Sequence, residues 1–318
     1  MRQTFCFSRL ERAFPLIRDF RQVGTEEAYR KLGVDYQDLC DPYWLREDPE
    51  LFYGFWGHSV NLYRQAEPHD GYHILKKWSE RLRAKKSLSV KTDQTGAIEG
   101  QTMKKSSSEA IICKPFFIYT SNVDAHFHRM FDETDIYEIH GNVETWQCSG
   151  NAQSSRNVCP QLHALPKSIQ FDINRETMLA DITDITDRLQ CGCQQRLRPN
   201  VLMFHDHQWI PNHLAEKNYI QWEAAVEEHL KANPMSRFVI VEIGCGTRIP
   251  SVRKESEVVV SDIFLKCEKR RQVQLVRINP EFPNSDNEII KENDLLISIQ
   301  NNACASLQLI DELIDAIN

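Results

Sequence analysis

The sequence lacks long apolar runs, and none approaches the roughly 20 residues that a membrane-spanning helix needs. Its opening, MRQTFCFSRLERAF, carries Arg9, Glu11 and Arg12 where a secretory signal needs its apolar stretch. It also lacks an excess of positive charge, because the formal net charge is −7. We therefore predict an intracellular protein, cytoplasmic or nuclear, with no membrane partner and no direct nucleic-acid binding.

The composition is that of a globular protein, with 41% hydrophobic and 26% charged residues. A chain of 318 residues is long enough for one large domain with a satellite, or for two domains. Ten cysteines without a signal peptide indicate a reducing compartment, in which thiols are buried, metal-bound or reactive rather than paired.

Short apolar segments alternate with helical patterns over much of the chain. Four of them, AIICKPFFIYT (110–120), RPNVLMFH (198–205), RFVIVEIGCG (237–246) and QVQLVRINP (272–280), are typical of buried strands, and IYEIH (136–140) is a shorter one. Helical spacing is visible in residues 71–84, 213–233 and 307–318. This alternation predicts an α/β fold with a doubly wound parallel sheet.

Three segments do not fit the strand and helix alternation. Residues 36–84 are rich in aromatics and helix formers, interrupted by prolines, and predict a module of short helices. Residues 85–109 have almost no apolar periodicity, so we predict a mobile surface insertion. Residues 147–196 are polar and contain cysteines, which indicates a small inserted module.

Polar or glycine-rich residues follow several of the predicted strands. In parallel sheets ligands bind outside the carboxyl ends of the strands, so these residues are expected to share one cleft. Taken singly, each has an ordinary explanation as a strand-end turn, and only their convergence favours a site. They are Thr120, Ser121, Asn122 and Asp124 after the first strand, His140 after the second, Gly244, Cys245, Gly246 and Thr247 after the fourth, and Asn279 after the last.

Five motifs in this order, TSNVD, HG, RPNVLMF, GCGTRIP and RINPE, resemble those of sirtuins, the NAD-dependent protein deacylases. The segment Asp19-Phe20-Arg21 is similar to the family's Pro-Asp-Phe-Arg, and GFWGHSVNLYRQAEPHDGYHIL is close to a microbial sirtuin-like subgroup. The resemblance extends from about Asp19 to Pro283. It implies a discontinuous Rossmann-like NAD-binding domain (1–35, 110–146 and 197–318) and a small domain built from 36–84 and a zinc-ribbon-like 147–196.

The resemblance also implies roles for single residues. His140 would be the general base that draws a proton from a ribose hydroxyl of NAD, and an imidazole suits this task near neutral pH. Asn122 would orient the ribose or a water, and an acylated-lysine protein would be the substrate. The cofactor-binding residues implied are Asp19, Phe20, Arg21, Thr120, Ser121, Asn122, Asp124, Gly244, Cys245, Gly246, Thr247 and Asn279, and the zinc ligands are Cys148, Cys159, Cys191 and Cys193.

The chain departs from the family pattern at three places. Where sirtuins have a Gly-Ala-Gly loop for the NAD pyrophosphate, the segment SRLERAFPLIRDFR contains no glycine, and too few residues precede it for more than a short strand. The cysteines do not form two Cys-x-x-Cys pairs, so a structural zinc and four free thiols are both compatible with the sequence, with His163 as a substitute ligand. His205 stands where sirtuins usually carry a glycine.

Three functions therefore stay open. The leading one is NAD-dependent protein-lysine deacylation, favoured by His140 and Asn122. The second is a catalytically impaired relative that binds a nucleotide or a protein partner, favoured by the absence of the Gly-Ala-Gly loop. The third is an NAD glycohydrolase, in which water replaces the acyl-lysine. The acyl group, the protein substrate and the oligomeric state are not encoded in any recognisable pattern.

Overall fold

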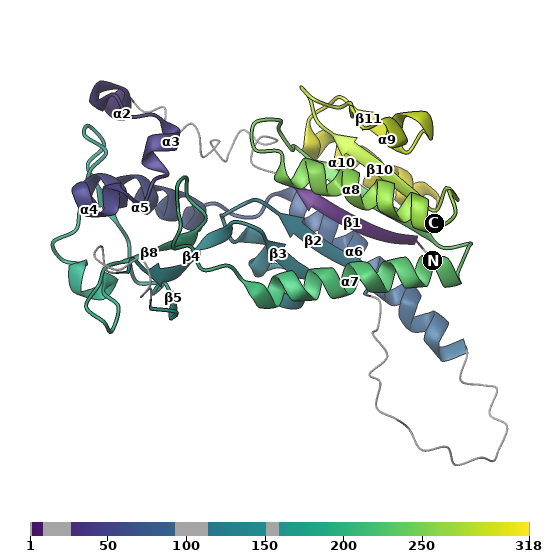
Figure 1. Ribbon diagram of the computed structural model, residues 1–318, viewed down its shortest axis with the longest axis horizontal. Helices are drawn as coiled ribbons and strands as arrows, with labels where there is room; N and C mark the ends of the chain where they lie inside the picture. The colour runs from purple at the N-terminus through teal and green to yellow at the C-terminus, as the bar shows by residue number, and fades with distance from the viewer. Residues whose placement is uncertain (1, 9–26, 93–113, 151–158, 318) are drawn as a thin grey trace, which may run out of the picture.

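The computed structural model of the chain describes residues 2–8, 27–92, 114–150 and 159–317, with side chains in these ranges except at 2–8 and 86–92. The fold is mixed α/β and has a larger part, built around a parallel sheet, and a smaller part beside it (Figure 1). Both ends of the chain lie on the larger part (Figure 1). Among the described residues, no helix combines the length and the apolar character that a membrane crossing requires.

The larger part contains a six-stranded sheet in the order β11-β10-β9-β1-β2-β3, and every neighbouring pair is parallel. All five residues of β2 are buried, as expected for a strand covered on both faces. The strands are β1 (Arg2–Ser8), β2 (Phe116–Thr120), β3 (Ile136–Glu138), β9 (Arg237–Ile243), β10 (Val273–Ile278) and β11 (Leu296–Ile299).

Helices pack on both faces of this sheet. On one face, α7 (His213–Ala232) and α8 (Ser251–Lys266) share a core with Phe117 and Ile240, and α9 (Glu288–Glu292) adds Ile290 to it. The helical spacing predicted for residues 213–233 is confirmed, because one stripe of α7 is buried and consists of Tyr219, Trp222, Val226 and Leu230. On the other face, α6 (Asp70–Thr92) and α10 (Ala303–Ile317) cover Phe116 and Ile118.

The smaller part joins helices to short antiparallel strands around an aromatic core. The ring planes of Tyr53 and Trp146 lie 7° from parallel, and Phe171 stacks on both rings. The main helix, α5, begins where Asp48 accepts a hydrogen bond from the Leu51 amide and a proline occupies the first turn. The elements are α2 (Glu27–Leu32), α3 (Tyr36–Leu39), α4 (Trp44–Glu47), α5 (Pro49–Gln65), β4 (Gly141–Cys148), β5 (Leu162–Ala164), β8 (Leu197–Val201), and the pair β6 (Asp172–Ile173) and β7 (Ala180–Asp181).

Three elements differ from the sequence-based expectation. The strand expected at 198–205 forms as β8, but it pairs antiparallel with β4 in the smaller sheet and not with the parallel strands. The last helix expected in the 36–84 module, α6, packs on the parallel sheet instead, and its helical backbone continues to Thr92. It thus covers the first eight residues of the predicted insertion, whose remainder, 93–109, lies outside the described residues. The opening residues, expected to give little more than a short strand, form β1 at the centre of the sheet.

Candidate functional site

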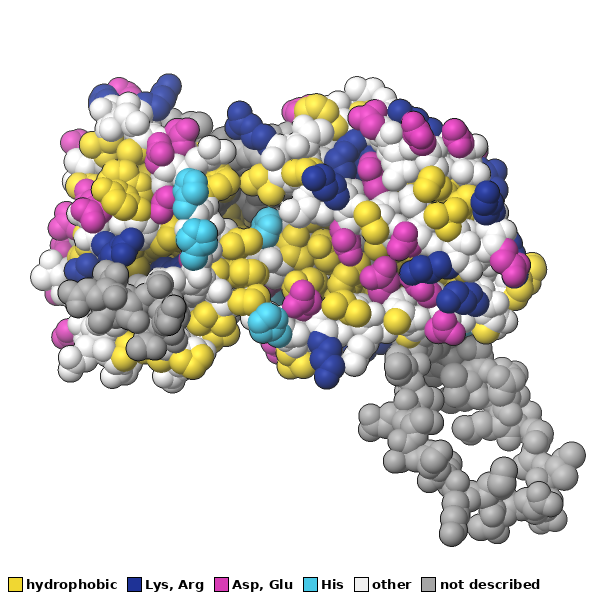
Figure 2. All heavy atoms as spheres, in the orientation of Figure 1, with side chains coloured by type: hydrophobic (Ala, Val, Ile, Leu, Met, Phe, Trp, Pro, Cys, Tyr) yellow, Lys and Arg dark blue, Asp and Glu magenta, His cyan; other side chains and the backbone are white. Residues whose placement is uncertain are grey.

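The candidate site lies at the carboxyl edge of the parallel sheet. Strand β1 pairs with β2 through Ser8 and Thr120, and with β9 through Ser8 and Ile243, so these three strands end level with one another. After β3 the next strand of this sheet along the chain is β9, which lies on the opposite side of β1 from β2 and β3. Such a reversal of strand order is where open parallel sheets form a ligand crevice. This edge faces the smaller part (Figure 1), and the surface is hollowed between the two parts, with histidines on both sides of the hollow (Figure 2).

Asn122 lies just beyond β2 and is 1% exposed. Its backbone N–H donates to Thr120 Oγ1 at 3.0 Å, which tightens the turn at the strand end. The side-chain Oδ1 and Nδ2 atoms are both buried, and neither has a hydrogen-bond partner in the described part of the chain. An unpaired buried polar group costs about 1–3 kcal/mol, so a residue that carries two of them needs an explanation. A ligand that offers both a donor and an acceptor would satisfy them.

Asp124 and His126 form a buried pair next to Asn122. Asp124 Oδ1 accepts the His126 backbone N–H at 2.9 Å, and Tyr72 Oη donates to Asp124 Oδ2 at 3.4 Å. His126 Nε2 lies 2.9 Å from the Tyr63 carbonyl oxygen, so this nitrogen carries the hydrogen. His126 Nδ1 then faces Asp124 Oδ2 at 3.8 Å. Asp124 is therefore fixed by protein groups and contributes a carboxylate whose position is set in advance.

His140 is the second residue after β3, at the point where the chain passes from the larger sheet to the smaller one. The preceding residue, Ile139, donates its N–H to Thr120 O at 2.9 Å, and His140 O accepts from the Leu202 N–H at 2.9 Å. The next residue, Gly141, has φ +70°, a conformation that favours glycine. The backbone of His140 is thus tied to β2 on one side and to β8 on the other, and strands β2 and β3 bring His140 and Asn122 to the same edge.

The turn after β9 is held by the residue that follows β10. Gly244 has φ +68° and donates its N–H to Ile278 O at 3.0 Å. Asn279 Nδ2 donates to Cys245 O at 2.8 Å, while its Oδ1 accepts the N–H groups of Glu281 and Phe282. The side chain of Asn279, predicted as a cofactor contact, is therefore engaged in joining two loops. Ser121 is half-buried, Gly246 is buried and Thr247 is exposed.

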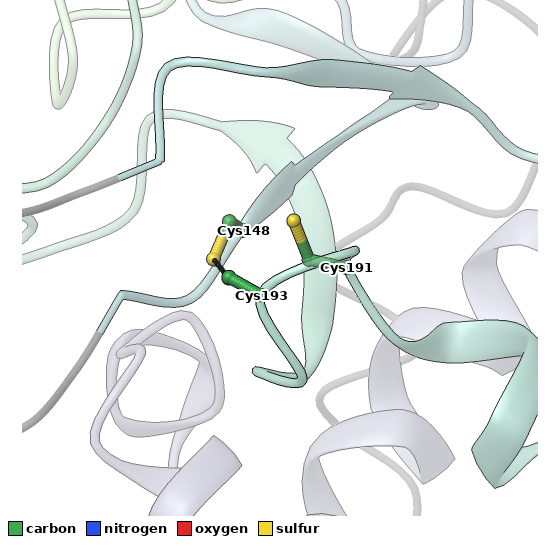
Figure 3. Close-up of side chains that lie close together, drawn as sticks. All are labelled: Cys148, Cys191 and Cys193. Atoms are coloured by element: carbon green, nitrogen blue, oxygen red, sulfur yellow. Dashed lines mark hydrogen bonds between the residues drawn. The ribbon is translucent and has the colours of Figure 1, made fainter.

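A cysteine cluster lies in the smaller part, at the far end of β4. Cys148 ends β4, and Cys191 and Cys193 lie on a turn closed by the hydrogen bond from Cys191 N to Gln195 O at 2.8 Å. The three sulfur atoms lie within 4.8 Å of one another, with Cys148 and Cys193 in contact at 3.4 Å (Figure 3). Cys159 Sγ lies 3.7 Å from Cys191 Sγ.

This cluster could hold a metal ion such as zinc. Zinc binds four thiolates at about 2.3 Å in a tetrahedron, which separates the sulfurs by roughly 3.8 Å and is similar to the spacing found. Burial raises the pKa of the Cys191 thiol to about 12, whereas a backbone N–H from Gln195 lowers the pKa of Cys193. The predicted ligands Cys148, Cys191 and Cys193 are thus brought together. Cys159 adjoins them through Cys191 alone, and His163, considered as a substitute ligand, is not in the group.

A second acidic residue at the sheet edge was not predicted from the sequence. Glu138, the last residue of β3, is 9% exposed, and burial raises the pKa of its carboxyl group. It contacts His128 and Asn142, neither of which was singled out. The signal available was an acidic residue inside the apolar run IYEIH, two positions before His140. Asp19, Phe20 and Arg21, predicted to bind the cofactor, lie outside the described residues.

Comparison of the chain with models of known protein families and with curated proteins found no match.

Proposed function

We propose that the chain is an NAD-dependent protein-lysine deacylase of the sirtuin type, with its site at the carboxyl edge of the parallel sheet. The observation that carries this proposal is the buried amide of Asn122, which has no hydrogen-bond partner among the described residues and lies just beyond β2, the strand paired with β3. An amide without a partner in the described part of the chain, at the same sheet edge as His140 and Asp124, suits a ligand rich in hydroxyl and carboxamide groups. NAD is such a ligand.

The strand order supports an assignment to the Rossmann-like, doubly wound folds. Renumbered along the chain, the parallel strands run 6-5-4-1-2-3, which is the order 3-2-1-4-5-6 of dinucleotide-binding folds read from the other edge. In those folds the dinucleotide spans the crevice where the order reverses, here between β1 and β9. Gly244 and the turn around Cys245 would then border the adenosine half.

The residues at the edge fit the nicotinamide and ribose half of NAD. When bound, NAD would supply a ribose carbon activated by a departing nicotinamide. Asn122 would bind and orient the ribose through its free amide. His140 would accept a proton from a ribose hydroxyl at a ring nitrogen, and Asp124 would line the pocket from its fixed position. The protein would thus mainly position NAD and exclude water, because the cofactor carries the chemistry.

The cysteine cluster has a separate, structural role in this proposal. Cys148, Cys159, Cys191 and Cys193 would hold one zinc ion that ties β4 to the turn before β8. Since β4 begins at Gly141, immediately after His140, the metal would brace the same strand whose other end presents the histidine. The zinc would lie at the opposite end of β4 from His140 and would take no part in the reaction.

One observation favours a second function, that of a catalytically impaired relative which binds a nucleotide or a protein partner. The segment SRLERAF places Leu10, Glu11 and Ala13 where the family has glycines. A pyrophosphate cradled by backbone N–H groups needs that loop to approach closely, and bulky or acidic side chains hinder this.

Mass spectrometry of an acetyl-lysine peptide tests the proposal and separates the candidates. A deacylase removes the acetyl group only when NAD is present, and a His140→Ala variant with an unchanged circular-dichroism spectrum does not. Consumption of NAD without any change in the peptide would point to a glycohydrolase. NAD binding without consumption of either reactant would point to the impaired relative.

A further inference from the structure

Glu138 lies where it can control the orientation of His140. The carboxylate belongs to the last residue of β3, and Asn142 Nδ2 donates to Glu138 Oε2. This hydrogen bond closes a loop of side chain and backbone around Ile139, His140 and Gly141. The histidine thus lies in the middle of a short turn whose two ends are linked through Glu138 and Asn142.

Asn142 is itself held rigidly. Its Oδ1 accepts the N–H of Glu144 at 3.0 Å and the N–H of Thr145 at 2.9 Å. Because this oxygen already accepts two hydrogen bonds, the amide nitrogen must point the other way, toward Glu138. The far end of the turn is therefore anchored to the first residues of β4, and Glu138 is the acceptor that ties the near end to it.

A histidine neutralises the buried carboxylate. His128 Nε2 lies 3.1 Å from Glu138 Oε2, and the side chain of His128 is 33% exposed while that of Glu138 is 8% exposed. An uncompensated carboxylate at such a position is costly, and His128, when protonated, places a positive charge beside it. The exposed side of the imidazole ring lets it exchange protons with water.

We propose that Glu138 is a positioning residue for His140: its carboxylate, held between His128 and Asn142, fixes the turn that presents the imidazole, and this turn loosens when His128 loses its proton. The inference rests on the proposed role of His140. The pH would then regulate the site through the protonation of His128.

The direction of the pH effect follows from the groups that face the pair. Burial acts to lower the pKa of His128, but the hydrogen bond and charge of Glu138, with Glu133 and Asp124 nearby, raise it above its usual value. Burial raises the pKa of Glu138, and His128 and Asn142 oppose that shift. A histidine with a raised pKa stabilises the folded state fully below its unfolded pKa and loses this contribution as pH rises through the folded pKa. The ion pair is therefore complete between the titration of Glu138 and that of His128, and the turn loosens as the pH rises through the His128 titration.

Nuclear magnetic resonance of ¹⁵N-histidine-labelled protein tests this without any turnover, so it stays informative even where deacylation is absent. In the wild-type protein, the His140 ring signals should show an inflection at the pH at which His128 titrates. In Glu138→Gln the His128 midpoint should move to lower pH, and that inflection of His140 should vanish. His128→Gln, which keeps an amide donor but no charge, should remove it too. His213→Gln is the matched control, because His213 pairs with Glu216 at 3.2 Å on an exposed helix end.

Hydrogen exchange gives a second readout of the same turn. The amides of Ile139 and Leu202, which flank His140, should exchange roughly tenfold faster or more in Glu138→Gln, as expected for the loss of a hydrogen bond to a charged group. Unchanged His140 signals and unchanged exchange in a folded Glu138→Gln protein would overturn the proposal. If that variant does not fold, the same two measurements on His128→Gln decide the question.

Discussion

Gly141 lies so close to Asn200 that a Cβ atom on residue 141 would come within 1.9 Å of the Asn200 carbonyl oxygen. This contact joins β4 to β8 at the residue directly after His140, where Gly141 pairs with Val201. The glycine is therefore required twice, once for its φ of +70° and once for the missing side chain.

Gly141→Ala should lower the free energy of unfolding by about 2–4 kcal/mol, because left-handed strain and a backbone clash add together. Gly33→Ala is the matched control, since Gly33 has φ +72° but nothing within 4 Å of an added Cβ, and it should cost only about 1 kcal/mol. Urea denaturation of the two variants gives both values. Equal losses would show that the approach of Asn200 is not a constraint.

Asn122→Leu should leave stability unchanged or raise it by about 1 kcal/mol, because it removes two buried polar atoms that have no partner among the described residues and keeps the branched side-chain shape. Asn279→Leu is the control at a buried asparagine whose side-chain nitrogen and oxygen both make hydrogen bonds, and it should cost about 1–3 kcal/mol. Thermal unfolding in the absence of ligand compares them. A loss at residue 122 as large as that at residue 279 would mean that the Asn122 amide has a structural role.

Much of the larger part was predictable because its strands are continuous apolar runs. The strands that end at Thr120, Ile243 and Ile278 could be predicted from their apolar character alone. The helix that contains Tyr219 and Trp222 could be predicted from the helical spacing of its apolar residues. The polar residues that follow these strands lie at one edge of the sheet, because parallel strands end at the same edge.

The pairing of β8 and the contacts of Glu138 depend on information that periodicity does not carry. The five residues of β8, LRPNV, carry no pattern that distinguishes a parallel from an antiparallel partner, and the pairing with β4 is seen only in the structure. Similarly, the sequence shows an acidic residue in IYEIH but not the distant His128 that compensates it. The hydrogen bonds of the Asn279 side chain to Cys245 and to the following loop are likewise not visible in the sequence.

The cysteine cluster should carry about one equivalent of zinc in purified protein, because three sulfurs already lie at ligand spacing and a fourth adjoins them. Cys148→Ser should lose most of this metal, whereas Cys304→Ser, on the unrelated helix α10, should keep it. Elemental analysis by mass spectrometry measures both. Negligible metal in freshly reduced wild-type protein would leave the four residues as free thiols.

The chain should bind NAD far more weakly than a sirtuin with an intact phosphate loop. Replacing Leu10-Glu11-Arg12 with Gly-Ala-Gly, directly downstream of β1, should raise the affinity by at least about tenfold, since it removes an acidic group and allows close backbone approach to the pyrophosphate. Titration calorimetry of NAD into both proteins makes the comparison. Equal micromolar binding would show that the glycines are dispensable here.

The rate of nicotinamide release at millimolar NAD, with and without an acetyl-lysine peptide, tests the proposed deacylase site most directly. A high concentration of NAD compensates for weak binding, so the measured rate depends on the chemistry at His140 and not on the affinity for NAD. We predict release that requires the peptide and that falls by at least about a hundredfold in His140→Ala, in line with the loss of a general base. An unchanged rate in folded His140→Ala, or no release at all from the wild-type protein, would contradict the account.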